Sequence, residues 1–309
     1  MKVNEMKNNV KIEFDSAKNV FVGYVNGKQV KRSKHRIHVE NKIAMLGVPR
    51  ETFDEQAKVA AARDAKFGIN TRFSFVEKLV TMVAAGVQPS AVITGEGGLG
   101  KTFTVVKTLE TAGFKDISDL ADFQVGDLIR KSKCFTMVKG YSTAKGLYRT
   151  LFENNNSIIV FDDCDAVLKD PVALNLLKGA LDSYGKRIIS WNADMRDDDL
   201  PRSFNFEGRV IFISNMDQDK IDQAIRSRSM MIDLSMTQDQ KIERMETIAS
   251  SAEFLPEYDK QVKMDALALI RELKDSAKEI SLRTLISVSK IRAANPKDYK
   301  DLAEYMLTA

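Results

Sequence analysis

Short apolar runs alternate with amphipathic segments through the middle of the chain. Runs rich in Val, Ile and Phe are typical of strands that are buried on both faces of a parallel sheet. They occur at residues 91–94, 134–138, 158–161, 209–214 and 230–234. Helical patterns occur at residues 51–66, 74–85, 101–112, 143–153 and 171–184. This alternation predicts an α/β fold, a doubly wound domain built around a five-stranded parallel sheet.

Residues 1–48 follow a different pattern and are predicted to form a short β-rich appendage. Residues 11–14 and 20–25 read as strands, and Asn26-Gly27 is a strong signal for a hairpin turn. The returning segment, residues 28–38, is dense in Lys and Arg. These cations either contact the phosphates of a nucleic acid or protect a solvated edge strand against aggregation.

Strand patterns end after Leu234, and the rest of the chain is predicted to be helical. Thr237 and Gln240 match a capping box that opens a helix. Further helical patterns follow at residues 262–277, 282–294 and 297–307. We therefore expect an α/β core over residues 49–235, followed by a small helical lid over residues 236–309.

Composition narrows the class of protein. The two cysteines and two histidines among 309 residues are too few for a disulfide framework or a Cys-rich metal site, and they exclude most His-dependent catalytic sites. No apolar stretch approaches the roughly 18 residues of a membrane helix, and the polar N-terminus is unlike a signal peptide. We therefore expect a cytoplasmic protein with no membrane partner. The net charge of +4 is a mild indication of a polyanionic partner.

A phosphate-binding motif directly follows the first buried run: Gly95-Glu96-Gly97-Gly98-Leu99-Gly100-Lys101-Thr102. It matches Gly-x4-Gly-Lys-[Ser/Thr], in which glycines let the backbone turn tightly and direct N–H groups at phosphate oxygens. Lys101 would reach the β- and γ-phosphates, and Thr102 would place its hydroxyl on Mg²⁺. The helix that starts near Lys101 directs the positive end of its dipole at the same anion. The motif therefore predicts a nucleotide site.

Two carboxylates end the apolar run at residues 158–161. Asp162 would hold Mg²⁺, directly or through water, and Asp163 could orient and activate the attacking water. Asp165 is an alternative for the second role. A pair of Asp residues at a strand end can also be a mere turn or helix cap, but its spacing of about sixty residues after Lys101 favours the functional interpretation.

One amide and three guanidinium groups complete the candidate site. Asn215 ends the run at residues 209–214, where it could hydrogen-bond both the γ-phosphate and the lytic water, or only start a turn. Arg226 and Arg228 precede the fifth run; a guanidinium can neutralise developing phosphoryl charge, although basic residues also suit a helix end. Arg283 lies early in a predicted helix, where its charge opposes the dipole, which suggests an anionic partner.

Together these residues resemble an AAA+ ATPase, and the resemblance covers most of the chain. It implies that residues 95–102 are the Walker A motif, that residues 158–163 are the Walker B motif, and that ATP is the nucleotide. It further implies that Asn215 is sensor 1, that Arg228 is the arginine finger of the neighbouring subunit's site, and that Arg283 is sensor 2.

Two details of the motifs refine this resemblance. The stretch Arg226-Ser227-Arg228-Ser229 is similar to the Ser-Arg-Cys motif of clamp loaders, with Ser229 in place of the Cys, which makes Arg226 a second candidate finger or a residue that bridges subunits. Many family members carry Glu where this chain has Asp163, whereas bacterial replication initiators and helicase loaders carry Asp. The resemblance therefore implies hydrolysis with a carboxylate that is one methylene shorter.

The family also implies a homo-oligomer, a hexamer or pentamer in a ring or open spiral, with Mg²⁺ and ATP between subunits. Tyr141 would then face a central pore, where it grips a peptide or stacks a base, or it packs on its own subunit. Tyr141 and the basic segment 28–38 together favour a motor or loader that acts on DNA or on a DNA-bound replication protein. The acidic residues 194–199 favour the alternative, a protein-remodelling chaperone or assembly switch. The compact size suits a phage or mobile-element protein.

Overall fold

The computed structural model describes residues 10–15, 18, 20–48, 50, 62–63, 65–118, 131–140, 142–182, 185–192 and 200–309. The chain divides into two compact units, one within residues 1–68 and one over residues 69–309. Within the described residues, no helix combines the length and the apolar character that crossing a membrane requires.

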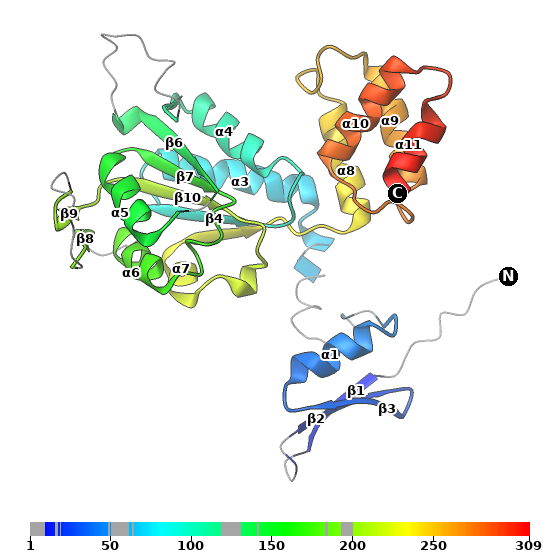
Figure 1. The fold of residues 1–309 in the computed structure, drawn as a ribbon, viewed down its shortest axis with the longest axis horizontal. Coiled ribbons are helices and arrows are strands. Elements are labelled where there is room, and N and C mark those ends of the chain that lie inside the picture. Colours follow the sequence, from blue (N-terminus) through cyan, green and yellow to red (C-terminus); the bar gives the residue numbers. More distant parts are fainter. Residues whose placement is uncertain are drawn as a thin grey trace. The chain divides into compact units, whose positions relative to one another are not determined.

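Residues 10–48 of the N-terminal unit, apart from gaps at 16–17 and 19, form a three-stranded antiparallel sheet followed by a helix, which confirms the predicted β-rich character (Figure 1). Its elements are β1 (Val10–Asp15), β2 (Val20–Val25), β3 (Lys28–Ser33) and α1 (Arg36–Ala44). The predicted hairpin turn joins β2 to β3, with positive φ angles of 51° at Asn26 and 78° at Gly27. Gly23 of β2 is needed because a Cβ there would lie 2.4 Å from Val39 of α1. The helix α1 was not predicted, and it covers one face of the sheet.

The second unit is built on a six-stranded parallel sheet in the order β11-β4-β10-β7-β6-β5. The strands are β4 (Ser90–Thr94), β5 (Lys115–Asp116), β6 (Cys134–Lys139), β7 (Ile158–Asp162), β10 (Arg209–Ile213) and β11 (Met230–Asp233). The five predicted strands are confirmed. The sixth, β5, has two exposed residues, so it carries no apolar run by which a sequence could reveal it.

Helices cover both faces of this sheet (Figure 1). They are α3 (Ile69–Ala84), α4 (Lys101–Thr111), α5 (Ala144–Glu153), α6 (Pro171–Ala180) and α7 (Gln223–Arg228). Alternate residues of β4 enter two separate apolar cores, because successive side chains of a strand point to opposite faces. Ile93 packs with α3 and α4, and Val92 packs with α5 and α6. The doubly wound prediction is therefore confirmed.

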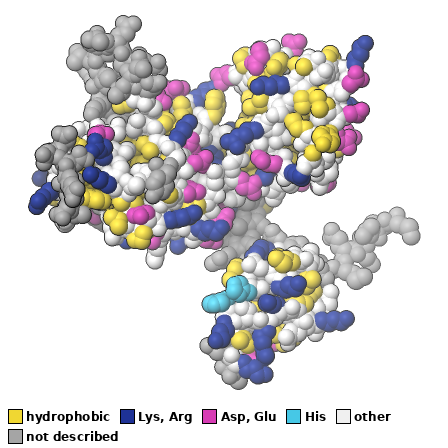
Figure 2. Space-filling view, in the orientation of Figure 1, with side chains coloured by type: hydrophobic (Ala, Val, Ile, Leu, Met, Phe, Trp, Pro, Cys, Tyr) yellow, Lys and Arg dark blue, Asp and Glu magenta, His cyan; other side chains and the backbone are white. Residues whose placement is uncertain are grey.

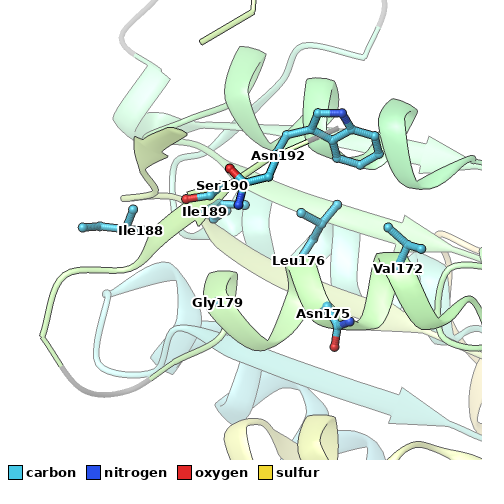
Figure 3. Close-up of a pocket in the computed structure, with 9 residues that line it drawn as sticks. Val172, Asn175, Leu176, Gly179, Ile188, Ile189, Ser190 and Asn192 are labelled. Carbon is cyan, nitrogen blue, oxygen red and sulfur yellow. The ribbon is translucent and has the colours of Figure 1, made fainter. Parts of the chain in front are cut away.

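A short antiparallel hairpin precedes β10, formed by β8 (Ile188–Ser190) and β9 (Ser203–Asn205). Tyr148 of α5 anchors it, because its hydroxyl donates to the Pro201 carbonyl at 2.6 Å and its ring contacts the rings of Trp191 and Phe204. The hairpin and α6 border an apolar hollow of about 240 Å³ (Figure 3). The acidic residues 194–199, which lie in the chain between β8 and β9, are outside the described residues.

The C-terminal part is a bundle of α8 (Gln238–Ala249), α9 (Lys260–Glu272), α10 (Leu282–Ala294) and α11 (Tyr299–Thr308). The predicted capping box opens α8: the Gln240 N–H donates to the Thr237 hydroxyl, and the Gln240 side chain accepts from the Thr237 N–H. Buried Arg72 of α3 donates to the carbonyl of Ser235 at 2.8 Å and to the side chain of Gln240 at 3.2 Å. This side chain therefore ties the α/β part to the start of the bundle.

Candidate functional site

The loop of residues 95–102 connects β4 to α4 and is held in a shape that requires glycine. Gly95, Gly98 and Gly100 have φ angles of 129°, 79° and 93°, a region that side chains strongly disfavour. A Cβ on Gly95 would lie 2.8 Å from the carbonyl carbon of Leu234, and one on Gly98 would lie 2.9 Å from the Cβ of Ser281. The loop is thus packed between the end of the sheet and the start of α10.

Lys101 is buried at the centre of this loop, with 5% of its surface exposed. Its Nζ donates to the carbonyl oxygens of Gly95 and Glu96, at 2.5 and 2.7 Å, and to Oδ1 of Asn215 at 2.9 Å. Burial lowers the pKa of Lys101, and nearby carboxylates, Asp163 foremost, oppose that shift. The loop therefore holds a positive charge where its backbone N–H groups would receive an anion.

Thr102 and Asp162 form a pair of oxygen donors beside that charge. The Thr102 hydroxyl donates to the two carboxylate oxygens of Asp162, at 3.0 and 3.1 Å. Asp162 is 8% exposed, and burial raises its pKa while the hydrogen bond from Thr102 opposes the shift. A hydroxyl and a carboxylate that converge in this way fit Mg²⁺, which prefers oxygen ligands and takes the remainder from phosphates and water.

Asn215 links Lys101 to Asp163. Its Nδ2 donates to Oδ1 of Asp163 at 2.6 Å, while its Oδ1 accepts from Lys101. These residues meet because β7 and β10 are neighbours in the sheet, with Asp162 opposite Ile213. Asp163 has a left-handed backbone, with φ of 56°, and its N–H donates to the Ile213 carbonyl at 3.1 Å. The exposed carboxylate of Asp163 is therefore directed along the edge of the sheet that carries the loop.

The neighbouring polar groups have other partners. Asp165 accepts a hydrogen bond from the Ser214 hydroxyl at 2.6 Å, which joins the segment after β7 to the end of β10. Cys164 is buried, and its Sγ donates to the Val138 carbonyl at 3.3 Å. Burial raises the pKa of Cys164 to about 11, so this thiol is neutral at physiological pH. Asp165 and Cys164 thus hold the local fold together.

Arg226 and Arg228 lie at the last turn of α7, outside the group that surrounds Lys101. Arg226 is exposed, and Arg228 is half-buried with its Nη1 donating to the Ala224 carbonyl at 3.1 Å. Within the part of the chain that the structure describes, the buried Nε of Arg228 has no hydrogen-bond partner. The structure therefore does not bring these two arginines to the candidate site of their own chain.

Arg283 directly follows the residue through which α10 contacts the loop. The N–H of Leu282, one residue earlier, donates to the Gly98 carbonyl at 2.7 Å. The exposed side chain of Arg283 lines a separate hollow of about 250 Å³ together with Glu279 and Thr284. Tyr141, the predicted pore residue, lies outside the described residues.

From the C-terminal bundle, sequence reasoning assigned only Arg283 to the site and missed the contacts made by α8 and by Leu282 of α10. Glu96 of the loop forms an ion pair with Lys241 of α8. An apolar hollow of about 900 Å³ adjoins the loop at Gly100 and Phe103 and is closed by residues of α8 and α10 that include Ile248 and Leu282. The sequence contains one signal for this hollow: Phe103, a large apolar residue directly after the motif. The structure shows that its side chain is 63% exposed.

One family model matches a stretch of this chain that contains the loop, Asp162, Asp163 and Asn215. The family model for "ATPase family associated with various cellular activities (AAA)" matches residues 91–236. A protein of Enterobacteria phage T4, described as an uncharacterized 36.7 kDa protein in the nrdC-mobD intergenic region, is 27% identical over 258 residues. The match covers 78% of this chain and 74% of the phage protein.

Proposed function

We propose that the protein binds and hydrolyses ATP through residues 91–236, the stretch that matches the AAA ATPase family model, and that it does so as a homo-oligomer acting on DNA or on DNA-bound protein. The oligomer is a ring or open spiral, a pentamer or hexamer. In this proposal residues 49–235 are the ATPase core, residues 236–309 are a lid that moves with the nucleotide state, and residues 1–48 are an appendage that meets the target.

The contacts from Lys101 through Asn215 to Asp163 carry the proposal for hydrolysis. The backbone N–H groups of the loop and the ammonium of Lys101 bind the β- and γ-phosphates. Asn215 orients the water, and its neighbour Asp163 accepts a proton from it as the water oxygen attacks the γ-phosphorus. The bond to the bridging oxygen breaks, ADP leaves, and inorganic phosphate forms.

Thr102 and Asp162 are the residues that would hold Mg²⁺. When bound there, the ion supplies positive charge that offsets the charge of the phosphate oxygens. The apolar hollow beside Phe103 would take the base, since it opens next to the loop and its lining is largely apolar. Because α8 and α10 close this hollow, ATP would bridge the core and the lid.

The oligomer is proposed because the arginines of α7 are not at the site of their own chain. A guanidinium that stabilises the transition state must approach the γ-phosphate. Arg228, with Arg226 as the second candidate, would therefore act on the ATP of a neighbouring subunit. Arg283, which follows Leu282 at the start of α10, would reach the phosphates when the lid moves.

The change Lys101→Ala tests the phosphate loop. ATP binding is expected to weaken about tenfold to hundredfold, because a charged hydrogen bond contributes about 1.5–3 kcal/mol. Isothermal titration of ATP into each variant measures the change, with Lys169→Ala as the control because Lys169 is exposed outside the loop. Equal ATP affinity in wild type and Lys101→Ala would reject the assignment of Lys101.

The proposed target is tested by ATP turnover in the presence of polymers. Turnover is expected to rise when single-stranded or duplex DNA is added, and the rise should shrink steeply between about 50 and 200 mM salt. An unfolded protein such as casein is the comparison. Stimulation by casein without stimulation by DNA would replace the proposed function with protein remodelling.

A further inference from the structure

The positive charge of the chain is concentrated at its N-terminus. Residues 1–50 contain eleven Lys and Arg against four Asp and Glu, whereas the rest of the chain contains 36 against 39. The ATPase part therefore has a slight excess of negative charge, and the net charge of +4 comes from the N-terminal unit. The N-terminal unit is therefore the part of the chain whose net charge favours a polyanionic partner.

Within this unit, the cations gather along β3 and the turn that leads into α1. Lys28, Lys31, Lys34 and Arg36, here called the β3–α1 basic surface, are all exposed. No Asp or Glu occurs between residues 28 and 39. Figure 2 shows dark-blue Lys and Arg side chains on this unit beside the cyan histidines.

Most of this charge is not neutralised by the protein itself. Arg32 pairs with Asp15 at 3.4 Å, and Arg36 pairs with Glu40 at 2.6 Å. Within the described residues, Lys28, Lys31 and Lys34 have no carboxylate partner. Three residues of an extended strand span about 10 Å, so successive ammonium groups of β3 can follow a linear array of phosphates.

The surrounding backbone is also open to a partner. Among the described residues, β3 is an edge strand that pairs only with β2, so its other edge carries no further strand there. At the start of α1, the N-cap residue His35 makes no side-chain capping hydrogen bond. The amino end of this helix, where the dipole favours an anion, thus lies in the same surface.

Protection of the edge strand does not account for the whole surface. Lysine on an edge strand opposes pairing with another sheet, which explains Lys28 and Lys31. Lys34 and Arg36, however, lie beyond the end of β3, where no strand edge needs protection. Cations that continue past the strand into a helix start fit a ligand that extends along both elements.

We propose that the β3–α1 basic surface binds the phosphate backbone of nucleic acid, without reading its sequence. The inference rests on the proposed function, because that function names DNA as the polymer. The basic surface would give the protein a DNA contact outside the ATPase core. The surface acts as a tether that holds the polymer whether or not ATP is bound.

The full-length protein without nucleotide provides the test, with fluorescently labelled duplex and single-stranded DNA followed by anisotropy. If the four cations contact phosphates, log Kd rises with log salt at a slope near 3.6 on duplex DNA, so binding weakens about 150-fold from 50 to 200 mM. The triple variant Lys28→Gln, Lys31→Gln, Lys34→Gln keeps the Arg36–Glu40 pair and should reduce that slope to about 0.9.

The matched control is Lys290→Gln, Lys297→Gln, Lys300→Gln, which removes the same charge from exposed positions in the C-terminal bundle. The control should bind DNA as the wild type does, and both triple variants should keep the ATP turnover measured without DNA.

If the wild type and the triple variant at Lys28, Lys31 and Lys34 bind DNA with the same affinity and the same salt slope, the proposal is overturned, even where DNA stimulates ATP turnover. Equal binding of poly-glutamate and DNA would overturn the assignment to nucleic acid. A third outcome separates this proposal from the proposed function. If the triple variant at Lys28, Lys31 and Lys34 loses DNA binding but DNA does not change the ATP turnover of the wild type, the basic surface is supported and only the coupling of DNA binding to ATP hydrolysis is rejected.

Discussion

The Asp163→Asn protein is expected to bind ATP as tightly as the wild type and to hydrolyse it about 10²–10⁴-fold more slowly, the range that a general base contributes. The substitution removes the basic oxygen but preserves the local structure. Asparagine tolerates the left-handed backbone found at this position, and its Oδ1 can still accept the hydrogen bond from Asn215. Single-turnover hydrolysis and ATP titration measure the two quantities separately.

Asp165→Asn is the matched control for this change. Asp165 accepts its hydrogen bond from Ser214, and asparagine retains that acceptor, so the control should hydrolyse ATP at close to the wild-type rate. The opposite pattern, with full activity in Asp163→Asn and loss in Asp165→Asn, would assign the base to Asp165. Unfolding temperatures of both variants should match the wild type if only chemistry has changed.

Arg228→Ala is expected to lower ATP turnover by about 10³–10⁵-fold in a homo-oligomer, because a guanidinium supplied to the γ-phosphate contributes on that scale. Activity should partly return when this variant is mixed with Lys101→Ala subunits. A junction between the two kinds of subunit then joins an intact loop from one to an intact arginine from the other. The measurement is turnover across a range of mixing ratios at fixed total protein.

Arg226→Ala distinguishes the two arginines of α7. Arg226 is exposed, and its removal should leave most of the turnover if Arg228 is the finger. Loss in Arg226→Ala with normal turnover in Arg228→Ala would exchange their roles. Absence of any recovery in the mixtures, or rapid turnover by a monomer at every concentration, would contradict action between subunits.

Much of the candidate site could be predicted because its parts are local or depend on simple sheet geometry. The loop of residues 95–102 needs glycines at its strained positions, so its motif is visible in one stretch of sequence. Asp163 and Asn215 each follow a buried run, and ends of parallel strands meet at one edge of a sheet. Their contact at 2.6 Å requires in addition that β7 and β10 be neighbours.

Other parts of the site and fold could not be predicted, because no short stretch of the sequence reveals them. The ion pair of Glu96 with Lys241 and the contact of Leu282 with Gly98 join residues far apart in the chain. The hollow beside Phe103 exists only because α8 and α10 pack near α4. Similarly, α1 follows a basic segment whose charges suggested an extended edge, and its helical packing depends on the gap that Gly23 leaves in β2.

The sequence by itself determined five of the six strands of the parallel sheet, the phosphate loop and the acidic and amide candidates that follow two of those strands, since each depends on residue type and short-range spacing. Only the tertiary structure decided that Asn215 bridges Lys101 and Asp163, that Asp165 is held by Ser214, and that the arginines of α7 lie away from their own loop. The physical reason is that these relations follow from strand order and helix packing, which arise from burial of apolar surface across the whole chain.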